Sequence, residues 1–159
     1  MKFSNQVLLT FILSVLLMPL ANADCNYHTV KLWFSSFEVI EPTNDFDICL
    51  EFGKVTGTLN GRYVACLYFS DWDFTSDDIW ADGVDSVELG KYYSYIETKA
   101  GMLEFVEWIY ASQGGEGGIS PVTGGTGAFE GANGSLKPGS YIGATAAQFF
   151  PLDGWVCTP

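Results

Sequence analysis

Hydrophobic and polar residues alternate with a period of two along most of the chain, and no segment sustains the 3.6-residue period of an amphipathic helix. Strands are predicted from this alternation over 28–40, 46–59, 62–69, 89–98, 102–111, 119–123, 132–137 and 140–150. The acidic, aperiodic stretch 70–86 is predicted to be a loop. About eight short strands separated by turn signals indicate an all-β sandwich or a closed barrel.

Turn signals join several of these strands. Asn60-Gly61 predicts a type I′ hairpin turn, Lys99-Ala100-Gly101 predicts a second hairpin, and 113–118 reads as a glycine-rich turn. Both faces of the 89–111 hairpin are largely apolar, which would promote aggregation if the hairpin stood alone. We therefore expect a barrel whose outer wall is itself covered, by a loop or by a second subunit.

The first 23 residues have the features of a signal peptide. A positive charge at Lys2 precedes the apolar run 7–20, and Ala21-Asn22-Ala23 has the form of a cleavage site. We therefore expect one β-barrel domain over 24–159 in an exported protein, either secreted or periplasmic. A lipid anchor on Cys25 is the alternative, but Asp24 stands where a small residue is usual.

Four cysteines follow the signal segment: Cys25, Cys49, Cys66 and Cys157. Export to an oxidising compartment favours two disulfides, and the absence of a C-x-x-C pair disfavours a zinc ribbon. Three connectivities remain open. We favour Cys25–Cys157, which would fix both termini and hold the tail, over separate bridges to neighbouring strands.

Charge narrows the range of partners. The chain beyond residue 23 carries six Lys or Arg, seven less Lys2, against nineteen Asp or Glu, a formal net charge of −13. Nucleic acid and anionic membrane surfaces attract basic proteins, so we expect neither as a partner.

The stretch PVTGGTGAFEGANGSL (121–136) holds five glycines around Phe129. It lacks both G-x-G-x-x-G and a following Gly-Lys-Ser/Thr, which excludes a P-loop. A flexible linker would not carry a phenylalanine between two strands. We interpret the stretch as a sharp corner in which glycines allow close approach and Phe129 fills the bend.

The same residues resemble the glycine signature of the allene oxide cyclase and dirigent barrel superfamily. The matching positions are Gly124, Gly125, Thr126, Gly127, Phe129, Gly131, Ala132 and Gly134. The stretch GKVTGTLNGRY (53–63) is similar to a hairpin of bacterial members. The resemblance implies an eight-stranded antiparallel barrel with an apolar cavity, often assembled as a dimer or trimer. Its plant members cyclise a fatty-acid epoxide or guide phenolic coupling, and no catalytic residue of theirs aligns here.

Three candidates for polar chemistry are weak. His28 is the only histidine and lies near a predicted disulfide, a poor position for a catalytic base. Asp71, Asp73 and Asp77 imitate part of an EF-hand loop, but Ser76 replaces the required glycine, so only an irregular calcium site is open. Asn133-Gly134-Ser135 is a glycosylation sequon in a eukaryotic host.

The 89–111 hairpin carries the best candidate site. A turn centred on Ala100-Gly101 would set Glu97 opposite Glu104 and Ser94 opposite Glu107. Alternation places Tyr93, Tyr95, Glu104 and Trp108 on one face, and Ser94, Phe105 and Glu107 on the other. Glu107 lies among apolar residues that would raise its pKa, as a general acid or base requires. The alternative is an outward Glu107, or one paired with Lys91 or Arg62.

These observations lead to two functional hypotheses. In the first, the barrel binds a small apolar or aromatic molecule and acts, if it is an enzyme, as a cyclase or isomerase without a cofactor. Glu107 and Glu104 are its candidate catalytic residues, and the candidate ligand contacts are Tyr93, Tyr95, Phe105, Trp108 and Phe129. In the second, side chains fill the barrel and the protein is a non-catalytic secreted binding module.

Overall fold

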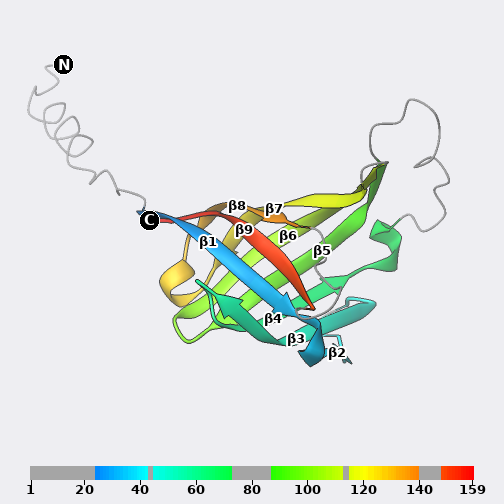
Figure 1. Cartoon of the computed structure of the whole chain (residues 1–159), viewed down its shortest axis with the longest axis horizontal. Helices are drawn as coiled ribbons and strands as arrows, with labels where there is room; N and C mark the ends of the chain where they lie inside the picture. The colour runs from blue at the N-terminus through cyan, green and yellow to red at the C-terminus, as the bar shows by residue number, and fades with distance from the viewer. Residues whose placement is uncertain (1–23, 43–44, 73–86, 113–114, 140–147) are drawn as a thin grey trace, which may run out of the picture.

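A computed structural model describes residues 24–42, 45–72, 87–112, 115–139 and 148–159, and almost all of them lie in antiparallel strands (Figure 1). The strands are β1 (Asp24–Trp33), β2 (Phe37–Ile40), β3 (Ile48–Gly57), β4 (Gly61–Leu67), β5 (Val87–Thr98), β6 (Gly101–Ser112), β7 (Gly115–Gly125), β8 (Asn133–Pro138) and β9 (Phe149–Thr158). Short 3-10 turns form at η1 (Phe34–Ser36), η2 (Phe69–Asp71) and η4 (Gly127–Phe129). No helix among the described residues is long and apolar enough to cross a membrane.

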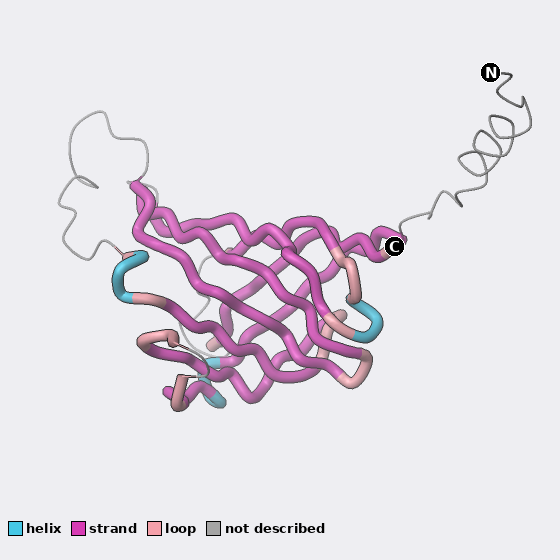
Figure 2. The backbone as a smooth tube through the Cα atoms, turned by 180° about the vertical axis from the view of Figure 1, so that it is seen from behind, coloured by secondary structure: helices cyan, strands magenta, loops and turns pink. Residues whose placement is uncertain are grey.

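Eight of these strands close into a barrel. The pairing order runs β1-β9-β8-β7-β6-β5-β4-β3, and β1 also pairs with β3 through Val30↔Gly57 to Leu32↔Val55. Strand β2 extends the sheet by pairing with the first half of β3. Seen from behind, the strands cross the barrel obliquely, as closure requires (Figure 2). The predicted closed antiparallel barrel of about eight strands is confirmed.

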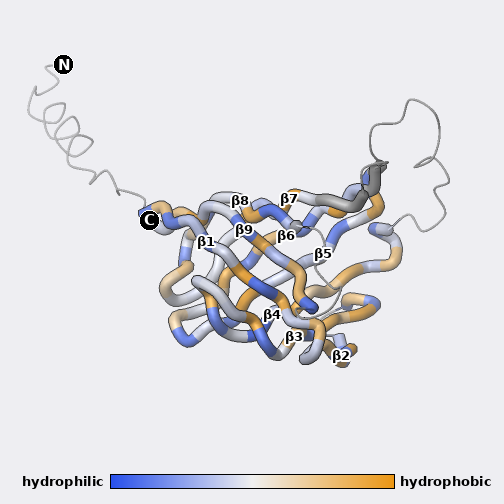
Figure 3. The backbone as a smooth tube through the Cα atoms, in the orientation of Figure 1, coloured by the Kyte–Doolittle hydropathy of each residue, from blue (hydrophilic) through white to orange (hydrophobic). Residues whose placement is uncertain are grey.

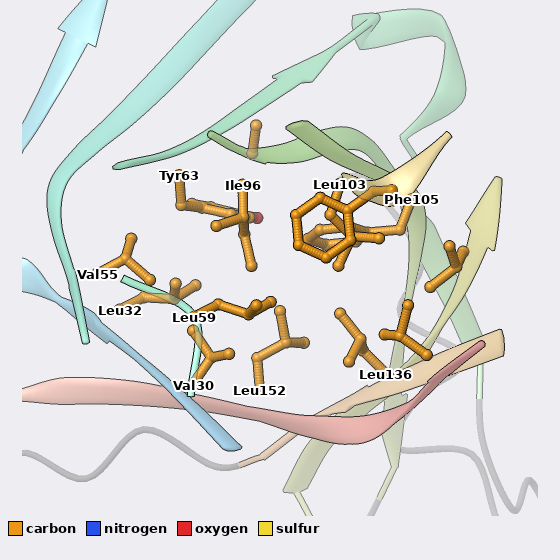
Figure 4. Close-up of a cluster of buried hydrophobic side chains, with 14 of the residues drawn as sticks. Val30, Leu32, Val55, Leu59, Tyr63, Ile96, Leu103, Phe105, Leu136 and Leu152 are labelled. Atoms are coloured by element: carbon orange, nitrogen blue, oxygen red, sulfur yellow. The ribbon is translucent and has the colours of Figure 1, made fainter. Parts of the chain in front are cut away.

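The barrel interior is the hydrophobic core. Inward positions alternate with outward ones along each strand. Hydrophobic and hydrophilic residues are therefore both found along the strands (Figure 3). Side chains from opposite walls meet at the centre (Figure 4). The largest of the fully buried ones are Phe105, Ile96, Leu103, Leu136 and Leu152.

The glycine-rich stretch forms the corner between β7 and β8. Phe129 lies in η4, is 8% exposed and packs into the core, as predicted. A Cβ on Gly125 would lie 2.2 Å from the Met102 carbonyl oxygen, which only glycine tolerates. Gly127 has φ +60°, a left-handed conformation that favours glycine. The backbone amide of the next residue, Ala128, donates to the Ala100 carbonyl in the β5–β6 turn. A backbone hydrogen bond therefore holds the corner against the β5–β6 turn.

Both disulfides join residues that are directly opposite on neighbouring strands. Cys25 on β1 bonds to Cys157 on β9, which fixes the two chain ends together as predicted. Cys49 on β3 bonds to Cys66 on β4. Two disulfides are typical of proteins that fold in an oxidising compartment. The signal-peptide prediction concerns residues outside the described part of the chain.

The outer wall carries a second apolar cluster. Cys49, Val64 and Cys66 are buried outside the barrel, and Phe46 packs over them from the segment that leads into β3. Tyr95 of β5 contacts the same cluster. This covering lies over β3 and β4; on the 89–111 hairpin, where a covering was expected, the Phe46 ring packs against Tyr93.

Several predicted boundaries were wrong. The stretch 28–40 is interrupted by η1, and residues 115–118 belong to β7 because they pair with 109–112 of β6. The last described strand is 149–158, which extends beyond the predicted end at 150, while 140–147 of the predicted strand lies outside the described residues. The tail is thus a full strand.

Two predicted turns also differ. β3 and β4 are joined through 58–60, where the Asn60 side-chain amide donates to the Gly57 carbonyl, and the positive φ belongs to Gly57 and not to Gly61. The β5–β6 turn is centred on Lys99-Ala100, so the predicted pairs Glu97–Glu104 and Ser94–Glu107 were wrong. Glu97 lies opposite Met102, and Ser94 lies opposite Phe105.

Candidate functional site

Glu107 is an ionisable residue buried inside the barrel. It lies midway along β6, opposite Tyr92 of β5, and only 3% of it is exposed. Alternation along β6 places it on the same inward face as Phe105 and Leu103. The face predicted for Glu107 is therefore confirmed, although the strand register differed by two residues.

Two hydroxyl groups bind this carboxyl group. The Tyr63 hydroxyl donates to Oε2 of Glu107, and Ser94 Oγ donates to the same oxygen at 3.1 Å. The two hydroxyl oxygens are 3.2 Å apart. Among the described residues none donates to Oε1, so one carboxyl oxygen has no hydrogen-bond donor.

Burial decides the charge state of this group. Desolvation raises the pKa of Glu107 to about 7, although the hydrogen bonds from Tyr63 and Ser94 oppose the rise. Burial, followed by the nearby Glu107 carboxylate, raises the pKa of Tyr63 well above its usual value. Near neutral pH, a pKa of about 7 leaves Glu107 partly protonated and partly ionised, while the raised pKa keeps Tyr63 protonated.

Ser120 adds a second polar group to the interior. Phe105 lies opposite Val122 and Trp108 opposite Ile119, so the same register sets Ser120 of β7 opposite Glu107. Ser120 is fully buried, and no described residue forms a hydrogen bond with its Oγ. Unpaired buried hydroxyls are uncommon because they lose their bonds to water, so a bound water or ligand is the usual explanation. The sequence analysis did not find Ser120 or Tyr63.

The predicted ligand contacts divide between two faces of the barrel wall. Phe105 and Phe129 are in the core. Tyr93, Tyr95 and Trp108 alternate with the inward residues of their strands and lie on the outer face. Glu104 also faces outward, opposite Tyr95. The wall thus separates Glu104 from Glu107, and the two do not share a site.

Ion pairs do not neutralise Glu107. Arg62 binds Glu51 at 3.1 Å and Glu97 at 2.5 Å outside the barrel. Lys91 lies 3.5 Å from Asp71, whose carboxylate also accepts the Tyr93 hydroxyl. The outward or ion-paired alternative for Glu107 was wrong.

The remaining candidates contribute little to this site. Asp73 and Asp77 of the calcium hypothesis lie outside the described residues, and within the described part no three His, Cys, Asp or Glu side chains gather to hold a metal. His28 is on β1, where its Nδ1 lies 3.1 Å from Thr58 Oγ1, and partial burial lowers its pKa. Asn133 begins β8 and is exposed.

Strand pairing and site together define a closed antiparallel β-barrel with a polar cluster buried in its apolar interior. No protein-family model matches the chain, and no curated protein matches it. Among solved structures, a pterocarpan synthase dirigent protein is similar to this chain. The aligned region covers 86% of this chain and 84% of the chain of the dirigent protein. The identity is 10% and the TM-score 0.33, so our assignment of the fold rests on the strand pairing of this chain.

Proposed function

We propose that this exported barrel binds a small apolar or aromatic molecule that carries one polar oxygen, with that oxygen placed between Glu107 and Ser120. The supporting observation is the Ser120 hydroxyl, which is buried in an apolar interior without a hydrogen-bond partner among the described residues and lies opposite Glu107, whose two hydrogen bonds both reach Oε2. A hydroxyl or carbonyl group on a ligand would supply the missing hydrogen bonds. The apolar core residues around them suit a hydrocarbon or aromatic body.

The pKa of Glu107 favours proton transfer as the chemistry of this site. A carboxyl group with a pKa of about 7 is present in both forms near neutrality, which suits a general acid that is later a general base. In the proposed reaction, Glu107 donates a proton from Oε1 to the ligand oxygen. Tyr63 and Ser94 then stabilise the carboxylate through Oε2.

Such a reaction is an isomerisation or a cyclisation. Glu107 recovers a proton from the rearranged molecule at the end of the cycle, so atoms and charge balance without a cofactor or second substrate. Shape complementarity of the barrel would select the reacting conformation. The competing function is a non-catalytic secreted module whose barrel is filled by its own side chains.

Native mass spectrometry of protein purified from its source tests ligand binding directly. We expect a non-covalently bound mass of a few hundred daltons that Glu107→Gln protein retains less well. Glu130→Gln is the matched control, because Glu130 is exposed beside the glycine corner. Thermal-shift measurements with phenols and unsaturated fatty acids supply the second readout. Absence of any bound mass, with no shift from any of these compounds, would favour the filled module.

A further inference from the structure

The outer wall of the barrel carries a groove on the face opposite to Glu107. Its volume is about 440 Å³, within the range of small-molecule sites. Its floor and sides include Phe46, Tyr93, Tyr95, Met102, Glu104 and Val106. On β5 and β6, Tyr95 lies opposite Glu104 and Tyr93 lies opposite Val106. These two cross-strand pairs are neighbours on the outer face of the sheet.

One side of the groove is a fixed aromatic wall. The ring centroid of Tyr93 lies 5.5 Å from that of Phe46 and 5.7 Å from that of Tyr68. The ring centroids of Phe46 and Tyr68 are 4.7 Å apart. The Tyr93 hydroxyl also donates to Asp71. With its ring and hydroxyl both held, Tyr93 is pre-organised to receive a ligand, which reduces the entropy lost on binding.

Glu104 gives the groove a negative charge that no described residue neutralises. No hydrogen bond or ion pair within the described ranges reaches its carboxylate, since Arg62 binds Glu51 and Glu97 and Lys91 binds Asp71. Gly124 lies opposite Glu104 on β7 and has no side chain to fill the adjacent space. The carboxylate is therefore accessible beside the apolar and aromatic surface.

We propose that this groove binds a small organic cation with an apolar body, such as an aromatic amine. An ammonium group would pair with Glu104, and the face of Tyr95 would attract the same charge, whereas the Tyr93 ring already has the Lys91 ammonium 5.6 Å from its centroid. Met102 and Val106 would contact the hydrocarbon part. The net charge of −12 raises the local concentration of cations around the protein. The β5–β6 wall lies between this groove and the proposed interior ligand, and two inward-facing residues of that wall, Ser94 and Phe105, also border the groove.

The test compares two soluble probes that differ only in charge, 2-phenylethylammonium and 2-phenylethanol. Each is titrated into ¹⁵N-labelled protein that lacks the signal segment, and amide shifts of β5 and β6 are followed by NMR. We expect the cation to shift the amides around Tyr95 and Glu104 and to bind about tenfold more tightly than the alcohol, the effect of one charge-assisted contact.

Two variants separate this site from general attraction to an acidic protein. Glu104→Gln should weaken binding of the cation about tenfold and leave the alcohol unaffected. Glu130→Gln, which removes the same charge elsewhere, should bind the cation as the unmodified protein does. Circular dichroism verifies that each variant is folded.

Equal affinity for the two probes would overturn the proposal, as would unchanged binding by Glu104→Gln. So would an absence of shifts at Tyr95, including the case in which a second copy of the chain covers the groove in a stable oligomer. Sedimentation velocity at the NMR concentration identifies that case.

Discussion

Tyr63 and Glu107 form a hydrogen bond across the width of an intervening strand, from β4 to β6, with the hydroxyl of Tyr63 as the donor. Ser94, from the strand between them, donates to the same carboxyl oxygen. Three neighbouring strands thus contribute one polar side chain each to a buried cluster. The cluster couples the protonation of Glu107 to the stability of the barrel.

The first prediction concerns the pH dependence of stability. Burial raises the pKa of Glu107 from 4.5 to about 7, so the folded state binds the proton more tightly than the unfolded state does. The stabilisation is fully present below pH 4.5 and is lost as the pH rises through 7. We expect the free energy of unfolding to fall by about 2 kcal/mol from pH 5 to pH 8 through this group alone, since one pKa unit corresponds to about 1.4 kcal/mol.

Urea unfolding of the unmodified protein and of Glu107→Gln at both pH values measures this effect. The amide cannot titrate, so the variant should lack that part of the pH dependence, while Glu130→Gln should retain it. Identical pH dependence in Glu107→Gln and the unmodified protein would contradict a raised pKa.

The second prediction concerns Tyr63→Phe. The hydrogen bond from Tyr63 opposes the effect of burial on Glu107, so its removal should raise the pKa of Glu107 further. The carboxyl carbon of Glu107, followed by NMR during a pH titration, reports this pKa directly. Tyr68→Phe is the control, because Tyr68 packs in the outer aromatic cluster with Phe46. A pKa that stays unchanged or falls in Tyr63→Phe would show that Tyr63 does not stabilise the carboxylate.

The sequence could predict which residues share the interior with Glu107, but not its partners. Alternation has a period of two, so the register error of two residues on β5 and β6 left every side chain on its predicted face. The error arose at the turn. Thr98 Oγ1 donates to the Gly101 carbonyl and accepts from the Ala100 amide, which centres the turn one residue earlier than predicted.

Tyr63 and Ser120 could not be identified from the sequence because their roles depend on contacts between distant segments. Tyr63 is separated from Glu107 by 44 residues, and alternation in RYVACLYF sets Tyr63 and Tyr68 on opposite faces without showing which face points inward. Ser120 enters the site only because β7 pairs with β6 in a particular register. The glycine corner, in contrast, was predictable because its steric requirements are local.

The third prediction is that alanine substitutions at the two interior serines change the stability of the protein in opposite directions. Ser120 Oγ is buried without a partner, so Ser120→Ala removes a desolvated group and should stabilise the ligand-free protein by about 1 kcal/mol. Ser94→Ala removes a hydrogen bond to Glu107 and should lower the free energy of unfolding of the protein by about 1 kcal/mol. Urea unfolding at pH 6 compares the two. Equal losses from both substitutions would mean that Ser120 has a partner in the folded protein, such as a retained water.

The fourth prediction ranks the two disulfides. Cys25–Cys157 closes a loop with a sequence separation of 132, and Cys49–Cys66 one of 17. Restriction of the unfolded chain predicts losses of about 5 kcal/mol for the long loop and about 3 kcal/mol for the short one. Paired Cys→Ser variants unfolded in urea measure both. A larger loss from the 49–66 pair would mean that packing of the outer cluster, and not chain entropy, dominates.

The fifth prediction tests the corner that closes the barrel. In Gly125→Ala the new methyl group would meet the Met102 carbonyl oxygen at 2.2 Å and the Phe129 Cβ at 2.7 Å, so backbone and core must both move. We expect a loss of about 2 kcal/mol in unfolding free energy, the typical cost of overpacking. Gly53→Ala is the matched control, because a methyl group there meets nothing closer than 3.7 Å. Two variants with equal stability would show that the corner relaxes freely, and that close approach at Gly125 does not fix the turn between β7 and β8.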